Sequence, residues 1–355
     1  MAPTAPEDPL TNSQIAELLP IAGDDAKPPL NRAYRRASRK ALLWEEEAAC
    51  LHQEGRALTD LPSVGPYLEK IIRRWIEVSP IVAARPAIRD NFFTLTQVRS
   101  ILRGKPLWSH EVRGDLQMHS VWSDGSSSIQ EMAEAGEARG YEYVAITDHS
   151  KGLKIAGGID EEQLAKQADE IATVNESLRR SNRTIRVLRS IEVNLSPRGE
   201  VDMDLSSLAK LDIVLGCFHS ALRKKEDQTD RYVAALQNPA IHILGHPRGR
   251  IYNFRNGLSA DWAKVFGVAA DLDKAVEIDS YPDRQDLSLD LVRLAGKAGC
   301  RISLGTDAHG ESQLRFIEFG LASALKAKID RGRILNFMDR DELLTWTSSL
   351  KESAR

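Results

Sequence analysis

The stretch GDLQMHSVWSDG, residues 114–125, has the pattern of a short apolar strand that ends in a metal ligand. His119 closes the strand, Asp124 follows in a turn, and Gln117 stands two residues before His119. Successive side chains of a strand point to opposite faces, so Gln117 and His119 share a face. A glutamine amide is a poor ligand for the borderline metals that histidine selects. The stretch therefore predicts a metal site in which Gln117 is a doubtful ligand.

From residue 113 onward, short apolar strands alternate with amphipathic helices. This alternation predicts a parallel sheet, and both an open doubly wound sheet and a closed barrel fit it. The placement of polar residues at strand ends favours the barrel, because the carboxyl ends of barrel strands converge on one mouth. We expect an α/β barrel with seven strands at 115–119, 142–148, 185–193, 212–218, 241–246, 275–279 and 301–306.

Nearly every expected strand ends in a side chain that can hold a metal. Any one of these histidines is explained equally well as a polar side chain that is hydrogen-bonded within the protein. However, five of the chain's eight histidines stand at the carboxyl end of an expected strand. Imidazole and carboxylate without thiolate suit zinc, manganese or iron. Eight ligands exceed the needs of one ion, and two or three divalent ions typically hydrolyse phosphoesters through a metal-bound hydroxide. The candidate ligands are His119, Asp124, His149, Glu192, His219, His246, Asp307 and His309, of which Glu192, His219, Asp307 and His309 are also the candidate catalytic residues.

Basic side chains follow several of the same strands. As phosphate clamps they would make charge-assisted contacts. The alternative, a solvated loop charge, is weakest for the two arginines that flank a glycine after His246. The candidate phosphate-binding residues are Arg248, Arg250, Arg284 and Lys151. The histidines outside the pattern, expected on the surface or in the core, are His52, His110 and His242.

The chain divides by pattern into three parts. Residues 1–78 read as helices only, residues 79–112 as a helical connector, and residues 113–355 as the barrel. The net charge of −3 gives no overall basic field, so any nucleic-acid contact must rest on local patches. No apolar run approaches the ~18 residues of a membrane span, and the start, MAPTAPEDPL, lacks the pattern of a secretory signal. The three cysteines form no CxxC pair, and we expect a cytoplasmic protein.

Several motifs together resemble the PHP (polymerase and histidinol phosphatase) domains, in the form fused to bacterial and archaeal family X DNA polymerases. The motifs are GDLQMHSVWSDG, VAITDHSKGLKIAGGIDEEQL, DIVLGCFHS, LGHPRGR and GTDAHG, and the AGGIDEEQL portion is the discriminating one. The resemblance covers about residues 113–345 and implies a distorted seven-stranded β/α barrel with three metal ions. It implies a first ion held by His119, Glu192 and Asp307, with Gln117 in place of a histidine. It implies a second ion held by Glu192, His219 and His309, and a third held by Asp124, His149 and His246.

The N-terminal part resembles the helical domain of the same polymerases. NRAYRRASRKA is similar to a part of that domain and LPSVGPYLEKII to its helix-hairpin-helix, although Ser63 stands where the first hairpin glycine is expected. Such a hairpin presents backbone N–H groups to a DNA phosphate without reading sequence. For a run of basic residues, a solvated helix face is the alternative. The candidate DNA-binding residues are Tyr34, Arg35, Arg39, Ser63, Gly65 and Lys70.

Two activities of the resembling polymerases are not expected. The position of the lyase lysine falls on Ile71, one residue from Lys70, and that chemistry requires an amine. Only about thirty-five residues separate the hairpin from the barrel, too few for a polymerase palm. Asp202 and Asp204 have the spacing of a palm pair but lie between two barrel strands, where we expect a loop.

Three functions remain open from the sequence. The first is a metal-dependent 3′–5′ exonuclease or 3′-end processing enzyme for DNA ends or gaps in repair. The second is a small-molecule phosphatase of the histidinol-phosphate type. The third is a DNA-end-binding module without catalysis. The hairpin favours the first over the second, and the nearly complete ligand set favours it over the third. No protein partner follows from the sequence.

Overall fold

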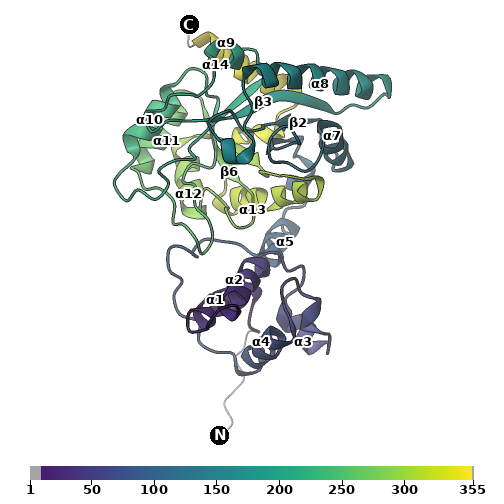
Figure 1. Ribbon diagram of the computed structural model, residues 1–355, viewed down its shortest axis with the longest axis vertical. Helices are drawn as coiled ribbons and strands as arrows, with labels where there is room; N and C mark the ends of the chain where they lie inside the picture. Colours follow the sequence, from purple (N-terminus) through teal and green to yellow (C-terminus); the bar gives the residue numbers. More distant parts are fainter. Residues whose placement is uncertain (1–8, 354–355) are drawn as a thin grey trace.

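A computed structural model describes residues 9–353, so most of the start on which the expectation about a secretory signal rests lies outside it. Seven parallel strands pair in the order β1 to β7, each with its sequence neighbour (Figure 1). The expected strands are all present, and their ends differ from expectation by at most two residues. The strands are β1 Gly114–Met118, β2 Tyr143–Ile146, β3 Arg186–Asn194, β4 Ile213–Cys217, β5 Ile243–Leu244, β6 Ala275–Asp279 and β7 Arg301–Gly305.

Hydrogen bonds between the segment after β7 and strand β1 bring the two edges of the sheet together. The Asp307 N–H donates to the Gln117 carbonyl at 3.0 Å, and the His119 N–H donates to the Ala308 carbonyl at 2.7 Å. The buried carboxylate of Asp115 accepts from the Thr306 N–H at 3.1 Å. The expected distorted seven-stranded β/α barrel is confirmed.

Helices surround the barrel, and their starts follow from the sequence. Ser128 caps one helix and Asp160 another, each with a glutamate or glutamine three residues on in a reciprocal capping box. The helices of this part are α7 Ile129–Ala138, α8 Glu161–Arg180, α9 Leu205–Leu208, α10 Thr229–Gln237, α11 Trp262–Asp271, α12 Leu289–Ala298, α13 Ile317–Ala327 and α14 Arg340–Ser353.

The barrel interior is apolar at one end and polar at the other. Leu116, Leu215 and Ile243 of the strands pack with Leu343 and Trp346 of α14, which closes the amino end. Because the amino end of the interior is filled with apolar side chains, the buried polar side chains gather at the carboxyl end.

The N-terminal residues form helices with a hydrophobic core of their own, around Ile15, Leu19, Trp44 and Ile72. The connector helix α5 packs into the outer core of the barrel instead, through Val98 and its neighbours. No described helix combines the length and the apolar character that crossing a bilayer requires. The helices before the barrel are α1 Asn12–Asp24, α2 Leu30–Ala41, α3 Ala48–Gln53, α4 Pro66–Val78, α5 Leu95–Arg103 and α6 Leu107–His110.

The hairpin between α3 and α4 keeps the backbone shape of a glycine hairpin despite its serine. Ser63 has φ 67°, in the left-handed region where glycine is normally found. Gly65 caps α4, and Pro66 occupies the first helical position, where its missing N–H costs nothing. Ser63, Gly65 and Lys70 are all exposed.

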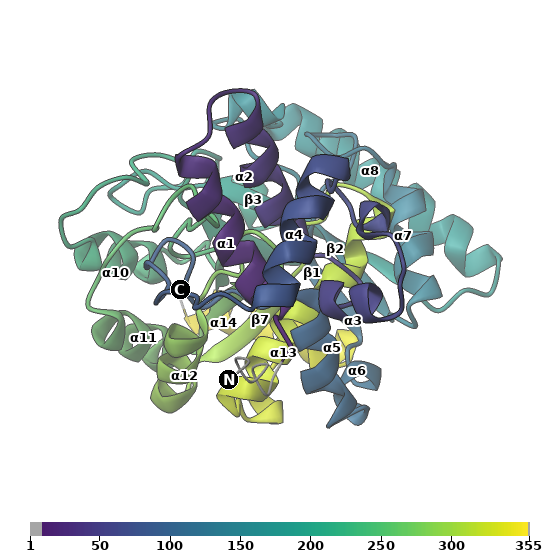
Figure 2. The same cartoon turned by 90° about the horizontal axis from the view of Figure 1, so that it is seen from below.

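Seen from below, the helices α1, α2 and α4 lie in front of the barrel (Figure 2). They face its carboxyl end, because Arg39 of α2 lines a cleft together with His309, which follows β7. The loop after β5 makes the connection through Tyr252, which is buried in the helical core. The Tyr252 hydroxyl donates to the Ala16 carbonyl at 3.0 Å and lies 3.1 Å from Ser38 Oγ. Its ring packs edge-on against Phe92, with ring centroids 5.0 Å apart. One barrel loop is thus anchored in the helical region.

Candidate metal centre

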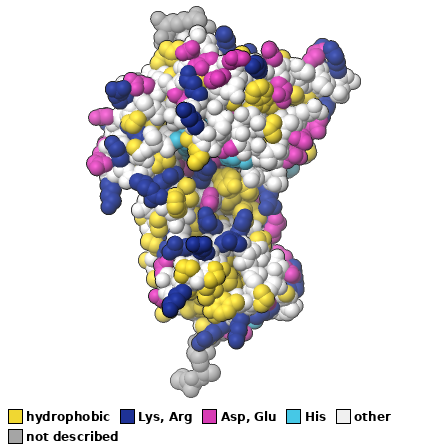
Figure 3. Space-filling model, in the orientation of Figure 1, with side chains coloured by type: hydrophobic (Ala, Val, Ile, Leu, Met, Phe, Trp, Pro, Cys, Tyr) yellow, Lys and Arg dark blue, Asp and Glu magenta, His cyan; other side chains and the backbone are white. Residues whose placement is uncertain are grey.

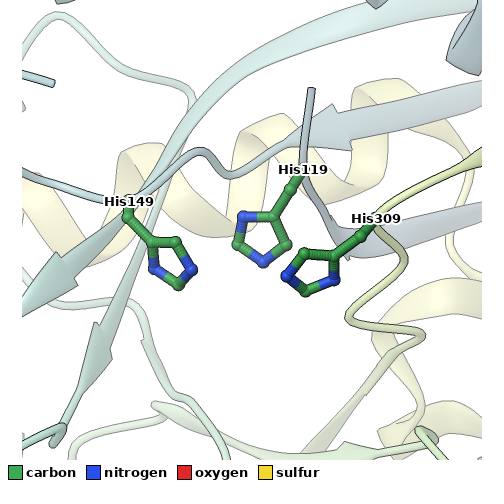
Figure 4. A group of neighbouring side chains, drawn as sticks. All are labelled: His119, His149 and His309. Carbon is green, nitrogen blue, oxygen red and sulfur yellow. The ribbon is translucent and has the colours of Figure 1, made fainter. Parts of the chain in front are cut away.

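The candidate ligands converge at the carboxyl ends of the strands. Figure 4 shows the imidazoles of His119, His149 and His309 reaching into one space from the segments that follow β1, β2 and β7. The ring centroid of His119 lies 4.3 Å from that of His149 and 4.5 Å from that of His309. The donor atoms of these three histidines fall within 4.8 Å of one another, as required of ligands that share an ion.

The buried carboxylate of Glu192 lies at the middle of the cluster. Its Oε1 is 2.8 Å from His219 Nε2 and 2.7 Å from His246 Nε2. Its Oε2 is 3.4 Å from His119 Nε2 and 3.4 Å from His149 Nδ1. One carboxylate therefore touches four imidazoles, two through each oxygen.

Two further carboxylates flank Glu192. Asp307 Oδ1 is 2.9 Å from His119 Nε2, and Asp307 Oδ2 pairs with the guanidinium of Arg284. Asp124 Oδ1 lies 3.5 Å from His149 Nε2 and 3.4 Å from His309 Nε2. The structure thus brings all eight candidate ligands into one continuous cluster.

The division of this cluster into sets differs from the expectation in one respect. His309, expected beside Glu192 and His219, lies instead beside Asp124. His246, expected beside Asp124, lies beside Glu192. The order of the strands explains the exchange, because β5 follows β4 whereas β7 closes against β1. The first expected set, His119, Glu192 and Asp307, is brought together as written.

The charges in the cluster favour ionised carboxylates. Burial raises the pKa of Glu192, but His149, His246 and His219 outweigh this and hold that pKa well below its ordinary value. Burial likewise opposes ionisation of Asp307, yet Arg284 and His119 keep its pKa below the usual range. Burial lowers the pKa of His149 to about 4, so this imidazole is neutral at pH 7. His246 and His309 differ: burial opposes their protonation, but Glu192 outweighs it and raises the pKa of His246 to about 10, and Asp124 and Asp307 raise the pKa of His309 to about 9. These two imidazoles would therefore release a proton on binding a metal ion, because a histidine ligand is neutral.

Local backbone features aim the ligands. His246 has φ 22° and Asp307 has φ 51°, both in the left-handed region that is costly for residues with a Cβ. Gly125 permits the turn that carries Asp124, because a Cβ there would lie 2.6 Å from the His119 carbonyl carbon. The buried Asp148 carboxylate accepts from the Ser120 N–H at 2.8 Å and so holds the start of that turn.

The residues present fit divalent metal ions. Imidazole and carboxylate donors lie close together, and five of the eight residues, His119, His149, Glu192, His246 and Asp307, are buried. Within the described chain, Gln117 Oε1 and His119 Nδ1 are buried without a hydrogen-bond partner, and such atoms are costly unless something else engages them. The donor chemistry suits zinc, manganese or iron.

Of the expected phosphate-binding residues, some lie near the ligand cluster and others do not. Arg284 reaches the cluster through Asp307. Lys151 remains exposed, with Nζ 2.7 Å from Glu161 Oε1. Arg248 donates to the carbonyls of Leu258 and Asn256.

The expectation for Arg250 is corrected by the structure. Its guanidinium is buried, donates to the Asp90 carbonyl at 2.9 Å and stacks 3.7 Å from the ring centroid of Phe92. These contacts fasten the loop after β5 to the connector. Arg250 is thus a structural arginine, because its charge faces connector backbone and ring instead of the open mouth.

The expected DNA-binding residues also differ in whether their side chains are exposed. Tyr34 is only 4% exposed and packs inside the helical core, so its ring is not available to a DNA end, which corrects that expectation. Arg35 is exposed and lies 3.4 Å from Asp24 Oδ1. Arg39 lies at the junction, where it lines a cleft of ≈390 Å³ together with His309 and Arg284. Ser63, Gly65 and Lys70 are exposed at the hairpin and the start of α4.

Several residues at the centre are not among the candidate site residues expected from the sequence. Asn194 Oδ1 is 3.2 Å from His219 Nδ1, and the alternation of strand β3 places it on the face of Glu192. Glu277, in the middle of β6, accepts from the His246 N–H at 2.6 Å. Cys217 forms a group of possible ligand atoms with Glu192 and His246. Period-two alternation could have found Asn194, whereas only the fold shows the other two contacts.

Comparisons with known proteins agree with this geometry. Residues 115–305 match the family model described as PHP domain. A DNA polymerase/3′-5′ exonuclease of Bacillus subtilis is 37% identical over 227 residues, which are 64% of this chain and 39% of that protein. This chain therefore spans less than two thirds of that relative.

A probable phosphatase of Syntrophotalea carbinolica is 28% identical over 201 residues, which are 55% of this chain and 79% of the relative. A solved structure of histidinol phosphate phosphatase from Lactococcus lactis, complexed with zinc, L-histidinol and phosphate, aligns with a TM-score of 0.42. That alignment has 14% identity and covers 68% of this chain and 94% of that one.

Proposed function

The chain belongs to the PHP domain family of metal-dependent phosphoesterases, and from that premise we propose that it removes nucleotides from the 3′ ends of DNA. The observation that carries this proposal is the cleft at the junction, where Arg39 of α2 faces His309 and Arg284 of the barrel. A basic residue of the helical region there gives a polyanion a second point of attachment beside the centre. The name of the Bacillus relative, which includes a 3′-5′ exonuclease, supports the same choice.

The helical region is the part that distinguishes a DNA substrate from a small one. Its hairpin exposes Ser63, Gly65 and Lys70, and Gly65 begins α4 with free backbone N–H groups. A helix N-terminus of this kind favours a phosphate without reading the base sequence. We propose that residues 9–78 form a DNA-holding domain, residues 79–112 a connector and the rest a phosphoesterase barrel.

The side chains of the centre have separable roles in this proposal. His119, Glu192 and Asp307 would hold one divalent ion, Glu192, His219 and His246 a second, and Asp124, His149 and His309 a third. When bound, such ions supply Lewis acidity and make water a stronger nucleophile at neutral pH. Arg284, paired with Asp307, is placed to neutralise a phosphoryl oxygen that enters from the cleft. Asn194 orients the His219 ring through Nδ1.

A small-molecule phosphatase is the second candidate. It is favoured by relatives named probable phosphatases, of which this chain covers 79% in one case and 89% in another. In that reading the helical region would serve stability only, since it anchors the loop after β5 through Tyr252. A DNA-end-binding module without catalysis is the third candidate, and the continuous ligand cluster speaks against it.

One experiment separates the three candidates. The protein with manganese is given a labelled single-stranded oligonucleotide, a gapped duplex and histidinol phosphate in parallel. The His219→Ala variant tests the centre, and His110→Ala, which removes an exposed histidine outside the centre, is the matched control. Nucleotide release by the wild type and the control, but not by His219→Ala, supports the proposal. Turnover of histidinol phosphate alone supports the phosphatase, and no turnover with less than one metal ion per chain supports the binding module.

A further inference from the structure

Phe254 is an exposed aromatic residue at the entrance to the metal centre. Its side chain is 55% exposed, and it lines the same cleft as His309, Arg284 and Arg39. Exposed aromatic rings beside a polar centre are typical of sites that hold a planar ligand, because a ring left in water gains by stacking. The role of Phe254 is not explained by the chemistry of phosphate hydrolysis alone.

The loop that carries Phe254 is held firmly. Tyr252 is buried in the helical core, and Asn253 donates its N–H to the Ile88 carbonyl at 3.0 Å. Asn253 Oδ1 accepts from Arg89 at 3.0 Å. Asn253 has φ 53°, so the chain turns between the buried Tyr252 and the exposed Phe254. A ring fixed in this way loses little further freedom when a ligand stacks on it.

Positive charge surrounds Phe254. The Arg223 guanidinium lies 4.8 Å from the Phe254 ring centroid. Arg255 Nε donates to the Gly249 carbonyl, and burial and the like charges of Arg284 and Arg223 lower the pKa of this guanidinium. Asp283 also lines the cleft, and burial raises its pKa. Figure 3 shows Lys and Arg side chains gathered along the junction between the two lobes, close to exposed histidine.

We propose that this cleft is the subsite for the terminal nucleotide of a single-stranded DNA 3′ end, with Phe254 stacking on the terminal base. Arg39 and Arg223 then face its phosphates, and His309 marks the side of the cleft where the scissile phosphate lies. This inference rests on the proposed function and adds to it a preference for a base at the 3′ terminus. A terminal base of a duplex must first leave its stack, so a single strand is the preferred form.

The test uses two oligonucleotides that differ only in the last residue, which is a normal nucleotide in one and an abasic tetrahydrofuran in the other. The wild type with manganese should cleave the normal end with a kcat/KM about 5- to 150-fold higher, the range that base–aromatic stacking produces. Phe254→Ala should cleave both ends equally, and Phe254→Trp should restore the preference. Leu205→Ala, which truncates another exposed apolar residue, 58% exposed at the start of α9, should keep it.

The outcomes separate this inference from the function on which it rests. Equal cleavage of the two ends by the wild type would overturn the stacking subsite and leave the exonuclease standing. A preference that survives in folded Phe254→Ala, or that is lost in folded Phe254→Trp, would also overturn the subsite. A wild type that releases nucleotides from neither oligonucleotide would overturn both the subsite and the proposed function.

Discussion

The side-chain amide of Gln117 donates a hydrogen bond to Glu192 Oε2 at 3.2 Å. The one residue that departs from the ligand pattern is therefore engaged with the central carboxylate and not with solvent. Its position on the face of His119, expected from strand alternation, is confirmed by their shared contact with Glu192 Oε2. With a neutral amide in this place, the first ion would have one strong ligand fewer than with a histidine. The ligand sets of the second and third ions would be unaffected.

Replacement of Gln117 by histidine should tighten metal binding without being needed for activity. The new imidazole adds a borderline ligand where the amide stands, and we expect an affinity gain on the order of tenfold or more, the scale on which neighbouring groups tune metal sites. Isothermal titration of the metal-free protein with manganese or zinc measures it. Gln117→Leu, which removes the donor to Glu192 without adding a ligand, is the control. Hydrolysis that appears only in Gln117→His would refute the idea of a working wild-type centre.

Gly305 is needed because the cluster has no room for a methyl group behind it. A Cβ at this position would lie 2.2 Å from Glu277 Oε1 and 2.7 Å from Gln117 Cβ. Gly305→Ala should lower the free energy of unfolding by about 1–3 kcal/mol, the usual cost of overpacking, and should reduce the metal content. Urea unfolding and elemental analysis measure the two effects. Gly267→Ala is the control, because its Cβ would meet nothing within 4 Å inside α11. Equal stability of both variants would count against the tight packing described.

Tyr252 should couple the helical region to the loop that carries His246 and Phe254. Tyr252→Ala removes a buried ring and should lower the free energy of unfolding by about 3–5 kcal/mol. Tyr252→Phe keeps the ring but removes the hydroxyl, with its hydrogen bond to Ala16 and its contact with Ser38, and should cost about 1 kcal/mol. Hydrogen exchange should become faster in residues 246–256 of Tyr252→Ala. Unchanged exchange in that loop would mean that the helical region does not hold it.

His242 should make the protein less stable in mild acid. It is buried, its Nδ1 accepts from the Val214 N–H at 3.1 Å, and burial lowers its pKa from 6.5 to about 3. The unfolded chain therefore binds a proton below pH 6.5 that the folded protein refuses, so stability falls as pH falls from 6.5 toward 3. Near pH 4.5 the loss from this group is about 3 kcal/mol.

The matched variant for this prediction is His242→Asn, whose amide can accept the same hydrogen bond but does not titrate. Urea unfolding between neutral pH and pH 4.5 should give a shallower loss of stability in His242→Asn than in the wild type. Parallel pH curves for the two proteins would show that His242 does not contribute.

The sequence predicted the barrel and its ligand positions because both depend on local pattern. The strand ends predicted that His119, Glu192 and Asp307 lie at one mouth of a barrel, and the resemblance to the PHP domains implied that they share an ion. The exchange of His246 and His309 between sets arose because grouping depends on which strands are neighbours around the barrel. With β7 closing against β1, His309 must lie near Asp124 of the turn after β1.

The contacts between the helical region and the barrel could not be predicted from the sequence pattern. Arg250 and Tyr252 belong to a polar loop, and nothing local indicates that one is buried against Phe92 and the other in the helical core. Tyr34 sits in a basic stretch that suggests an exposed face, yet its ring points inward. Such long-range packing is decided by the shape of two surfaces and not by periodicity.

The most direct test of the central claim is the rate of nucleotide release from a 5′-labelled single strand by the manganese-loaded wild type and by Glu192→Gln. The substitution keeps the size of the side chain but removes the charge that touches His219 and His246. The account predicts release by the wild type and a loss of at least about 10²- to 10³-fold in Glu192→Gln, since several kcal/mol of charge stabilisation disappear. Equal rates in the two proteins would contradict the account.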